Sequence, residues 1–333
     1  MEQRILLIVR NFLLVLIIQI ISFPDYAQKI ASKKDKEVSI ELEEGTLYGS
    51  LLVPKSKKAV PVVLLIPGSG PTDRNCNSSM GLKSNSFLLL AEELYEKGIA
   101  TLRVDKRASG KSLETFINSI DSINFFDFSD DAMKWIDFLK EDTRFSKIIV
   151  AGHSQGSLVG MLAANNREVD GFISLSGAGR MIQEVLYDQL HDSFNYDVSA
   201  DTLKMFLDSI QTGTYFNDAP KKMRQTLPKD LLPFLNEWFG VDPEMEIKAL
   251  KCPVAIIQGA HDLQVSVQEA EILHNARNDA YYEVFPEMNH ILKDTPEEPF
   301  ANYAAYNDPD LPITAGLSDS IYEFIEKWVL TSE

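Results

Sequence analysis

The stretch "KIIVAGHSQGSLVG", residues 147–160, decides the fold prediction. Its apolar start predicts a buried strand, and the run after Ser154 has the composition of a helix. Gly152 and Gly156, two positions on either side of the serine, permit a turn so tight that side chains there would clash. The pattern G-x-S-x-G between a strand and a helix therefore predicts an exposed serine on a sharp elbow. A glycine-flanked N-cap serine is the alternative.

Short apolar runs alternate with amphipathic helical periods along most of the chain. This alternation predicts an α/β fold with a mostly parallel sheet and helices on both of its faces. Ahead of it, the alternating segment 38–54 turns at Glu44 and Gly45 and predicts a hairpin. The predicted strands are 59–67, 98–105, 146–152, 169–177, 252–259 and 280–286, and the clearest further helices are 86–98, 128–142, 266–277 and 319–330.

Residues from about 180 to about 248 interrupt the alternation. They contain three helix-like pieces and no convincing strand. An insertion between two strands of such a sheet usually lies over the strands' carboxyl ends, where ligands bind. We therefore predict a helical cap, with a packing excursion away from the site as the alternative. Four aromatic residues line its pocket or pack its interior: Tyr215, Phe216, Trp238 and Phe239.

The composition excludes some classes of partner. The chain has 333 residues, of which 45% are hydrophobic, enough for one large core. Its formal net charge of -17 repels phosphate backbones and anionic lipid surfaces, so we expect no nucleic-acid partner. Only two cysteines occur, Cys76 and Cys252, which excludes a disulfide framework. We favour two free thiols, and a single bridge is the alternative.

The first segment has the pattern of an export signal. Arg4 and Arg10 give a basic start, residues 12–21 are apolar apart from one glutamine, and a small residue, Ala27, ends the segment. We predict a signal peptide over 1–27, a linker over 28–37 and one α/β domain over 38–333. The protein would then be exported, periplasmic or secreted, with no stable membrane insertion. An uncleaved N-terminal membrane anchor is the alternative.

A serine hydroxyl needs a base, usually a histidine held by a carboxylate. Among the five histidines, His290 follows the last clear strand, on a loop from which an imidazole could reach Ser154. The carboxylate should follow the penultimate strand, where Asp262 stands in "GAHDLQV". Ser154, Asp262 and His290 are therefore the predicted catalytic residues, with a surface-loop histidine as the alternative for His290. The other histidines are His153 in the elbow, His191 in the cap, His261 in a turn and His274 in a helix.

Two backbone N–H groups would stabilise a developing oxyanion. One belongs to Gln155, directly after the serine, and the other to the loop "IPGSGPTDRN" after the first central strand. We choose Ser69 there, with Gly70 as the alternate register and a plain turn as the alternative role. No cofactor is predicted, because this loop lacks a phosphate-binding lysine and the full G-x-G-x-x-G spacing. No metal is predicted, because no third ligand stands near His261 and Asp262.

The motifs "PGSGPTDRN", "RVDKRASGKS", "GHSQG", "GAHDLQV" and "NHIL" together resemble the α/β-hydrolase superfamily. They are most similar to small secreted bacterial serine hydrolases, many called esterases or serine-aminopeptidase-like proteins. The resemblance runs from about Val38 to the C-terminus and is weakest in the cap. It implies an eight-stranded, mostly parallel sheet and a Ser-Asp-His triad. Ala108 departs from the family pattern, which usually has glycine there, and this puts the backbone of that turn in question.

By the same resemblance, Asp105, Arg107 and Ser112 organise loops beside the site. Ion pairs explain these residues equally well, either Asp73 with Arg74 or Asp105 with Arg107. The residue pattern does not choose between these roles.

These features predict hydrolysis of carboxylic esters through an acyl intermediate on Ser154. The same residues could cleave amides, as in an aminopeptidase or peptidase, with acidic cap residues binding an amino terminus: Asp188, Asp192 or Asp197. A third class is an envelope binding protein that keeps the fold without turnover. The expected partner is a small-molecule ester or amide, and the oligomeric state stays open. Because the base must be neutral and an ordinary imidazole has a pKa of about 6.5, activity should rise through mildly acidic pH.

Overall fold

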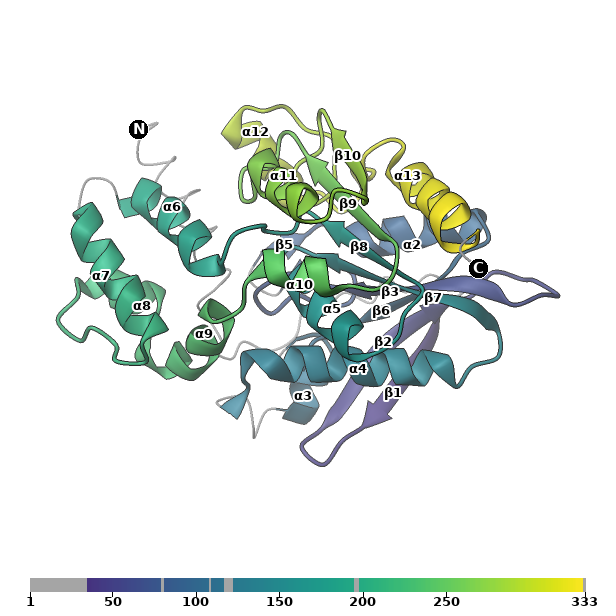
Figure 1. Ribbon diagram of the computed structural model, residues 1–333, viewed down its shortest axis with the longest axis horizontal. Helices are drawn as coiled ribbons and strands as arrows, with labels where there is room; N and C mark the ends of the chain where they lie inside the picture. The colour runs from purple at the N-terminus through teal and green to yellow at the C-terminus, as the bar shows by residue number, and fades with distance from the viewer. Residues whose placement is uncertain (1–34, 79–80, 108, 117–121, 195–197, 332–333) are drawn as a thin grey trace.

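The computed structural model describes residues 35–78, 81–107, 109–116, 122–194 and 198–331. The predicted signal peptide and most of the predicted linker lie outside this range. The described chain forms an eight-stranded sheet in the order β1-β2-β6-β3-β7-β8-β9-β10, and β4 and β5 form a separate two-stranded hairpin (Figure 1). The strands are β1 (Lys36–Glu41), β2 (Thr46–Leu52), β3 (Val60–Ile66), β4 (Asn77–Ser78), β5 (Leu82–Lys83), β6 (Ala100–Val104), β7 (Phe145–His153), β8 (Gly171–Leu175), β9 (Val254–Gly259) and β10 (Tyr281–Phe285).

The sheet is mostly parallel. β1 and β2 pair antiparallel around a turn in which the Leu42 N–H donates to the Gly45 carbonyl oxygen at 2.8 Å. β2 also pairs antiparallel with β6, and the neighbours from β6 to β10 pair parallel. This arrangement confirms the predicted fold class. β1 begins at Lys36, so the last two residues of the predicted linker belong to the first strand.

The strand order brings segments that are distant in sequence to one edge of the sheet. β3 pairs with β6 on one side and with β7 on the other, which makes β3 the point where the strand order reverses. Ile66 pairs with Gly152, so the loop after β3 starts beside the elbow. Phe285 pairs with Gly259, so the loops after β9 and β10 also start side by side.

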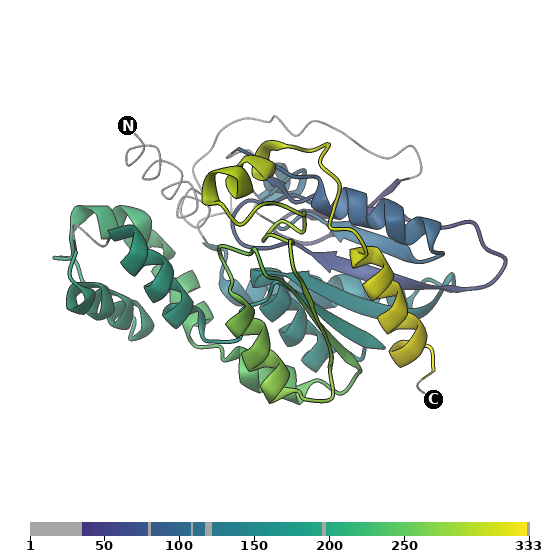
Figure 2. The same ribbon diagram turned by 90° about the horizontal axis from the view of Figure 1, so that it is seen from above.

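Helices cover both faces of the sheet (Figure 2). Leu64 and Leu65, adjacent in β3, point to opposite faces and belong to two different core clusters. The cluster of Leu64 includes Trp135 from α4, and the cluster of Leu65 includes Phe324 from α13. The helices outside the predicted cap are α2 (Ser86–Glu96), α3 (Ser112–Phe116), α4 (Phe125–Lys140), α5 (Gln155–Asn166), α11 (Val267–Ala276), α12 (Pro299–Ala304) and α13 (Leu317–Phe324), with short helical turns η3 (Ala305–Asn307) and η4 (Ile325–Val329).

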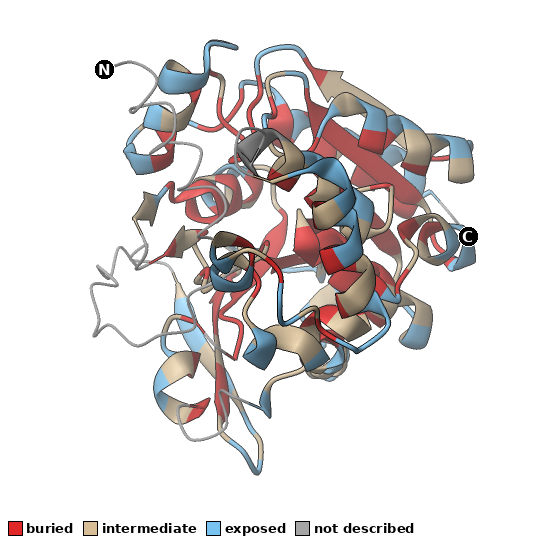
Figure 3. Cartoon of the chain, turned by 90° about the vertical axis from the view of Figure 1, so that its left-hand side faces the viewer, coloured by how far each residue is buried: buried red, intermediate tan, exposed pale blue. Residues whose placement is uncertain are grey.

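Between β8 and β9 the described residues form helices without a strand, and most of these helices stand as a group beside the sheet, on the left of Figure 1. Figure 3 shows their alternation of buried and exposed residues. Within the described residues, no helix is long and apolar enough to span a membrane. The helices of this segment are α6 (Ile182–Phe194), α7 (Ala200–Gln211), α8 (Lys221–Thr226), η2 (Lys229–Leu231), α9 (Leu232–Phe239) and α10 (Pro243–Ala249).

Candidate active site

Ser154 occupies a sharp turn between β7 and α5. Its backbone has φ 53° and ψ -123°, a strained conformation for a residue other than glycine. A Cβ atom on Gly152 would stand 2.0 Å from the Gly156 carbonyl oxygen, and a Cβ atom on Gly156 would stand 2.3 Å from the Ile66 carbonyl oxygen. Backbone atoms block a side chain at both flanks, so only glycine fits at either position.

The elbow is fixed to the sheet and opens onto a helix N-terminus. The Ser154 N–H donates to the Leu175 carbonyl oxygen in β8 at 2.9 Å. The next N–H, that of Gln155, donates to no acceptor in the described part of the chain. It belongs to the first turn of α5, where the positive end of the helix dipole favours an anion.

Asp262 and His290 come from the loops after β9 and β10 and meet through a hydrogen bond. Oδ2 of the aspartate lies 2.7 Å from Nδ1 of the histidine, and both side chains are buried. The Asp262 Oδ1 atom accepts the backbone N–H groups of Gln264 and Val265, at 2.8 Å and 2.9 Å. Gln258 Nε2 donates to Oδ2 at 3.1 Å. The carboxylate is therefore held by the protein itself, and Nε2 of His290 is the ring nitrogen left for another partner.

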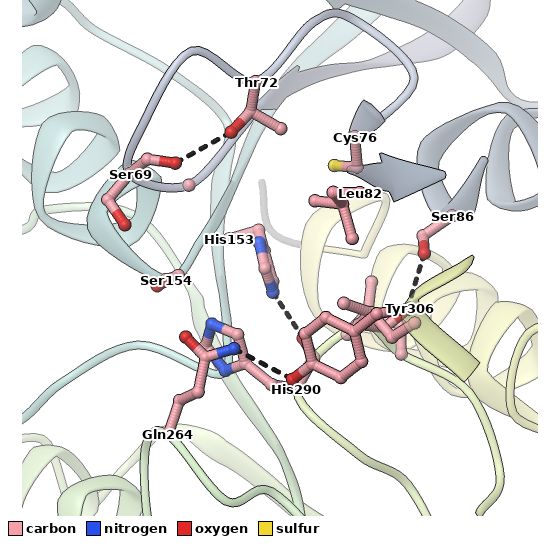
Figure 4. Close-up of a pocket in the computed structure, with 13 residues that line it drawn as sticks. Ser69, Thr72, Cys76, Leu82, Ser86, His153, Ser154, Gln264, His290 and Tyr306 are labelled. Carbon is pink, nitrogen blue, oxygen red and sulfur yellow. Dashed lines mark hydrogen bonds between the residues drawn. The ribbon is translucent and has the colours of Figure 1, made fainter. Parts of the chain in front are cut away.

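Ser154 and His290 line the same cavity, which Figure 4 shows in close-up. Its volume is about 40 Å³. The far wall is largely apolar and includes Leu82, Ile291 and Tyr306. Pockets for drug-sized ligands measure about 300–1,000 Å³, so this cavity is small. A group that enters it beside Ser154 must therefore be short.

A second cavity, of about 50 Å³, adjoins the elbow on the side of the predicted cap. Ser154 and Ser69 line both cavities, so the two hollows meet at the serine. Leu186 from α6 and Trp238 from α9 contribute to the wall of the second cavity. The helical segment between β8 and β9 thus shapes one side of the site.

The remaining cap aromatics mainly pack the cap interior. Tyr215 is buried and its hydroxyl donates to the Leu227 carbonyl oxygen at 2.8 Å. Phe239 is fully buried, and Phe216 packs against the same core cluster. Of the four aromatic residues considered from the sequence, Trp238 is the one that lines a cavity with Ser154.

The structure describes only one of the three acidic side chains considered for binding an amino terminus. Asp188 pairs with Arg180, with 2.8 Å between Oδ2 and the guanidinium nitrogen. Arg180 also pairs with the buried Glu269 at 2.6 Å. Asp188 is therefore engaged within the protein. Asp192 and Asp197 lie where no side chain is described.

His153, the variable residue of the elbow, has a contact that the sequence did not reveal. Its Nε2 atom lies 2.7 Å from the carbonyl oxygen of His290, and the two ring centres are 4.8 Å apart. Burial lowers the pKa of His153 to about 3. At neutral pH it is therefore an uncharged imidazole whose Nε2–H donates to the backbone of the His290 loop. From the sequence, His153 was considered only as the general base for Ser154 and was rejected in that role.

The other histidines lie away from both cavities. His191 stacks on Tyr187 within α6, and His274 stacks on Tyr282 of β10. Nδ1 of His261 lies 2.6 Å from the carbonyl oxygen of a loop threonine. In the part of the chain that the structure describes, no group of three His, Cys, Asp or Glu side chains is arranged to hold a metal ion.

The loop after β3 lies against the elbow. A Cβ atom on Gly68 would stand 3.1 Å from the Ser154 Cβ, so the glycine permits this close approach. The Ser69 carbonyl oxygen accepts the Thr72 hydroxyl at 2.7 Å. Gly70 has φ 76° and, unlike Ser69, lines neither cavity. No acceptor for the Ser69 N–H is present among the described residues.

The charged residues near this loop form different ion pairs from those considered in the sequence. Asp105 pairs with Arg74, with Oδ2 3.0 Å from Nε and 2.5 Å from a terminal nitrogen. Arg107 pairs with Asp131 at 2.7 Å and 2.6 Å. Asp73 instead accepts backbone N–H groups of its own loop. The pairs Asp73–Arg74 and Asp105–Arg107 were thus wrong, because the fold brings each guanidinium to a carboxylate of another segment, Arg74 to Asp105 after β6 and Arg107 to Asp131 in α4.

Asp105 and Ser112 also organise backbone around the site. Asp105 accepts the Lys111 N–H at 3.1 Å, and a Cβ on Gly110 would stand only 2.4 Å from its Oδ1. The Ser112 hydroxyl accepts the Tyr48 N–H at 2.9 Å. These contacts agree with a loop-organising role. Ala108 lies outside the described residues.

Cys76 and Cys252 are free and buried. Burial raises the pKa of both thiols, that of Cys252 to about 11, so both are neutral at pH 7. Cys76 lines the first cavity, whereas its polar surroundings in the sequence indicated an ordinary loop position.

Comparisons with known proteins show what the chain is similar to. Residues 78–222 match the family model described as serine aminopeptidase, S33. Esterase EstD from Thermotoga maritima is 27% identical over 292 residues, a match that covers 83% of this chain and 65% of that esterase. The chain thus matches slightly less than two thirds of this relative's length.

Two solved structures share the fold. Est1E from Butyrivibrio proteoclasticus with ferulic acid has a TM-score of 0.58 at 17% identity, over 88% of this chain and 100% of that one. An acylaminoacyl peptidase from Pyrococcus horikoshii has a TM-score of 0.55 at 16% identity, over 92% of this chain and 43% of that one.

The sheet, the elbow after β7 and these structural neighbours define an α/β-hydrolase fold. The resemblance to the α/β-hydrolase superfamily, and within it to esterases and serine-aminopeptidase-like proteins, is confirmed.

Proposed function

We propose that this protein hydrolyses carboxylic esters, with Ser154 as nucleophile, His290 as general base and acid, and Asp262 as the carboxylate that orients His290. One observation carries the proposal: the 2.7 Å hydrogen bond between Asp262 and His290 Nδ1, made by a histidine that shares a cavity with Ser154. The name of the Thermotoga maritima relative supports ester hydrolysis.

The reaction would proceed in two acyl transfers. Ser154 Oγ attacks the ester carbonyl carbon while its proton passes to His290 Nε2. The tetrahedral intermediate then expels the alcohol, which takes that proton, and an acyl-serine ester remains. Water attacks the acyl carbon with the same histidine as base, and the carboxylic acid leaves as Ser154 recovers its proton. Asp262 stabilises the transient imidazolium.

The oxyanion would be bound by the N–H groups of Gln155 and Ser69. Neither group has an acceptor among the described residues, and both residues line the second cavity with Ser154. Ser69 is preferred to Gly70 because Ser69 lines both cavities that meet at the serine. Donors placed in advance around a developing negative charge lower the barrier without reorganisation.

The test is Ser154→Ala assayed with p-nitrophenyl acetate. We expect a loss of at least about 10³-fold in kcat, since removal of the nucleophile leaves only binding and the oxyanion donors. Ser266→Ala, at an exposed helix N-cap whose hydroxyl makes no capping bond, is the matched control and should keep the parent rate. A Ser154→Ala protein with the parent rate would refute the proposal.

A second candidate, hydrolysis of amides, is favoured by the family model described as serine aminopeptidase. The same three residues would serve, with His290 protonating the amine as it leaves. Asp188 is engaged by Arg180, which argues against it as the anchor for an amino terminus. Comparing kcat/KM for an aminoacyl anilide and a short acyl ester separates the two candidates, and we expect the ester to be the better substrate.

The third class, a binding protein without turnover, is tested by a fluorophosphonate probe. We expect labelling that Ser154→Ala abolishes, and failure of the parent protein to label would favour the binding role.

We further propose export through cleavage near residue 27, on the basis of the N-terminal sequence pattern. N-terminal sequencing of the protein recovered from a cell-envelope or culture fraction tests it.

A further inference from the structure

Lys106 is a buried lysine in the loop that follows β6, two residues after the strand ends. Its residue exposure is 8%, and it forms no ion pair with a carboxylate among the described residues. Its ammonium instead donates to the Gly68 carbonyl oxygen, and Nζ lies 5.3 Å from the centre of the Phe128 ring. A buried charge without a counter-ion lowers the stability of the folded protein, so stability does not explain why a lysine stands at this position.

The Gly68 carbonyl belongs to the same peptide group as the Ser69 N–H. The described chain contains no cis peptide bond, and in a trans peptide the carbonyl and the N–H point in opposite directions. A carbonyl fixed toward Lys106 therefore directs the Ser69 N–H away from Lys106. This peptide lies against the elbow, where an added Cβ on Gly68 would approach the Ser154 Cβ to 3.1 Å.

We propose that Lys106 is the positioning residue of the oxyanion hole, which by binding the Gly68 carbonyl fixes and polarises the Ser69 N–H toward the intermediate on Ser154. This inference rests on the proposed function, because only an oxyanion formed at Ser154 requires that donor. A cation on the carbonyl oxygen draws electron density from the peptide nitrogen and strengthens its N–H as a donor. The Thr72 hydroxyl donates to the next carbonyl, that of Ser69. The peptide groups on both sides of Ser69 are therefore held by hydrogen bonds.

The groups that face Lys106 do not neutralise it. Among the described residues, two titratable side chains interact with it, Cys76 from the loop before β4 and His153 at the end of β7. Burial raises the pKa of the Cys76 thiol and lowers that of His153 to about 3, so both are neutral at pH 7. The ammonium also lies near the Phe128 ring and donates to the Gly68 carbonyl. Burial lowers the pKa of Lys106 to about 7.

The ammonium of Lys106 consequently loses its proton as the pH rises through about 7. Below about pH 7 the ammonium makes a charge-assisted hydrogen bond, and above it the neutral amine makes a weaker one. The kcat of the parent protein should therefore decline between pH 7 and pH 9. A positioning role limited to neutral packing would give no such decline.

The experiment compares Lys106→Met, Lys106→Arg and the exposed control Lys58→Met with the parent protein, using p-nitrophenyl acetate and thermal unfolding. For Lys106→Met we expect kcat at pH 6.5 to fall by about 10- to 100-fold, less than the cost of deleting an oxyanion donor. KM should change by less than about threefold, and Tm should not fall, because an unpaired buried charge has been removed. Lys106→Arg should retain more activity than Lys106→Met, and the alkaline decline should be absent from Lys106→Met.

Several outcomes would overturn the inference. The first is a Lys106→Met protein with the parent kcat and the parent pH profile. The second is a Lys106→Met protein in which the loss of kcat is accompanied by a fall in Tm, when Lys106→Arg loses as much kcat. If Lys106→Met does not fold, the parent profile decides, and a flat kcat between pH 7 and pH 9 is then the contrary result. Ser154→Ala runs in parallel. An active Ser154→Ala removes the proposed function and this inference together, whereas an inactive one with an unaffected Lys106→Met removes this inference alone.

Discussion

His153 Nε2 lies 2.7 Å from the carbonyl oxygen of His290, so the elbow residue before the proposed nucleophile holds the backbone of the proposed base. The donor must be neutral to keep this arrangement without a buried charge. Burial lowers the pKa of His153 to about 3 and so keeps its imidazole neutral. The loop of His290 is thereby anchored at two points: through its carbonyl to β7 and through Nδ1 to Asp262.

This pair predicts how stability depends on pH. The pKa of His153 is about 3 in the folded protein and about 6.5 for an ordinary imidazole in the unfolded chain. The unfolded state therefore binds more protons between these values. The resulting stabilisation is complete above about pH 6.5 and is lost as the pH falls toward 3. His153→Asn should flatten the acid branch of the unfolding free energy measured by urea denaturation from pH 4 to pH 8. The control His191→Gln should leave the branch unchanged, and an equally steep branch in His153→Asn would contradict the prediction.

Asp262→Asn tests the orientation of His290. The amide can present a donor where the carboxylate accepted the His290 Nδ1–H, which selects the wrong tautomer and removes the charge that stabilises the imidazolium. We expect kcat for p-nitrophenyl acetate to fall by about 10³- to 10⁴-fold with little change in KM. Asp319→Asn, at an exposed side chain remote from the cavity, serves as the control. Parent kcat in Asp262→Asn would show that the hydrogen bond is structural only.

Gly152→Ala tests the steric argument at the elbow. The new methyl group would stand 2.0 Å from the Gly156 carbonyl oxygen, and a backbone atom cannot yield as a flexible side chain can. We expect destabilisation by more than about 4 kcal/mol or failure to fold. Gly240→Ala, where the nearest atom is 3.3 Å away and φ is -83°, should cost less than about 1 kcal/mol. Urea unfolding of both variants makes the comparison, and equal stabilities would be inconsistent with a steric requirement.

Leu82→Ala tests whether the first cavity sets substrate length. The cavity of about 40 Å³ should accept only a short group from one side of the ester bond. Removing the leucine side chain enlarges it, so the kcat/KM ratio of a longer to a shorter substrate should rise by about tenfold, the equivalent of roughly 1.4 kcal/mol of differential binding. Two series, p-nitrophenyl esters of longer acids and acetates of longer alcohols, identify which side enters. Met245→Ala, an exposed residue that lines neither cavity, is the control, and an unchanged ratio in both series for Leu82→Ala would exclude this role.

Arg107→Met tests the buried ion pair with Asp131. Removal of the guanidinium leaves a carboxylate that is 9% exposed without its bidentate partner. We expect a loss of about 3 kcal/mol in unfolding free energy. Arg144→Met removes an exposed pair with Asp142 and should cost less than about 1 kcal/mol. Denaturation of the two variants at one pH provides the measurement, and similar losses would mean that burial adds nothing to the Arg107 pair.

Much of the fold could be predicted because its signals are local. The apolar runs that form β3, β6, β7, β8, β9 and β10 are short and mostly separated by helical periods, which is the pattern of a parallel sheet covered on both faces. The small elements were missed, including the β4–β5 hairpin and α10, because a two-residue strand and a seven-residue helix have too few residues to show a clear period. The cavity-lining position of Cys76 was missed for a related reason: a polar loop sequence does not reveal what folds over it.

The sequence alone determined that a serine stands on a strained elbow, because the clash that excludes a side chain at Gly152 is with the Gly156 carbonyl, four residues away. At Gly156 the blocking atom is the Ile66 carbonyl oxygen in β3, so that requirement also depends on the sheet. The sequence also showed that Asp262 and His290 follow two consecutive predicted strands, because the order of residues along the chain is read directly from it. Only the tertiary structure decided which buried groups meet: Arg74 with Asp105, His153 with the His290 carbonyl, and Lys106 with Gly68. These contacts join segments 31, 137 and 38 residues apart, so they depend on strand order and loop packing, whereas the clash at Gly152 depends only on residues of the same turn.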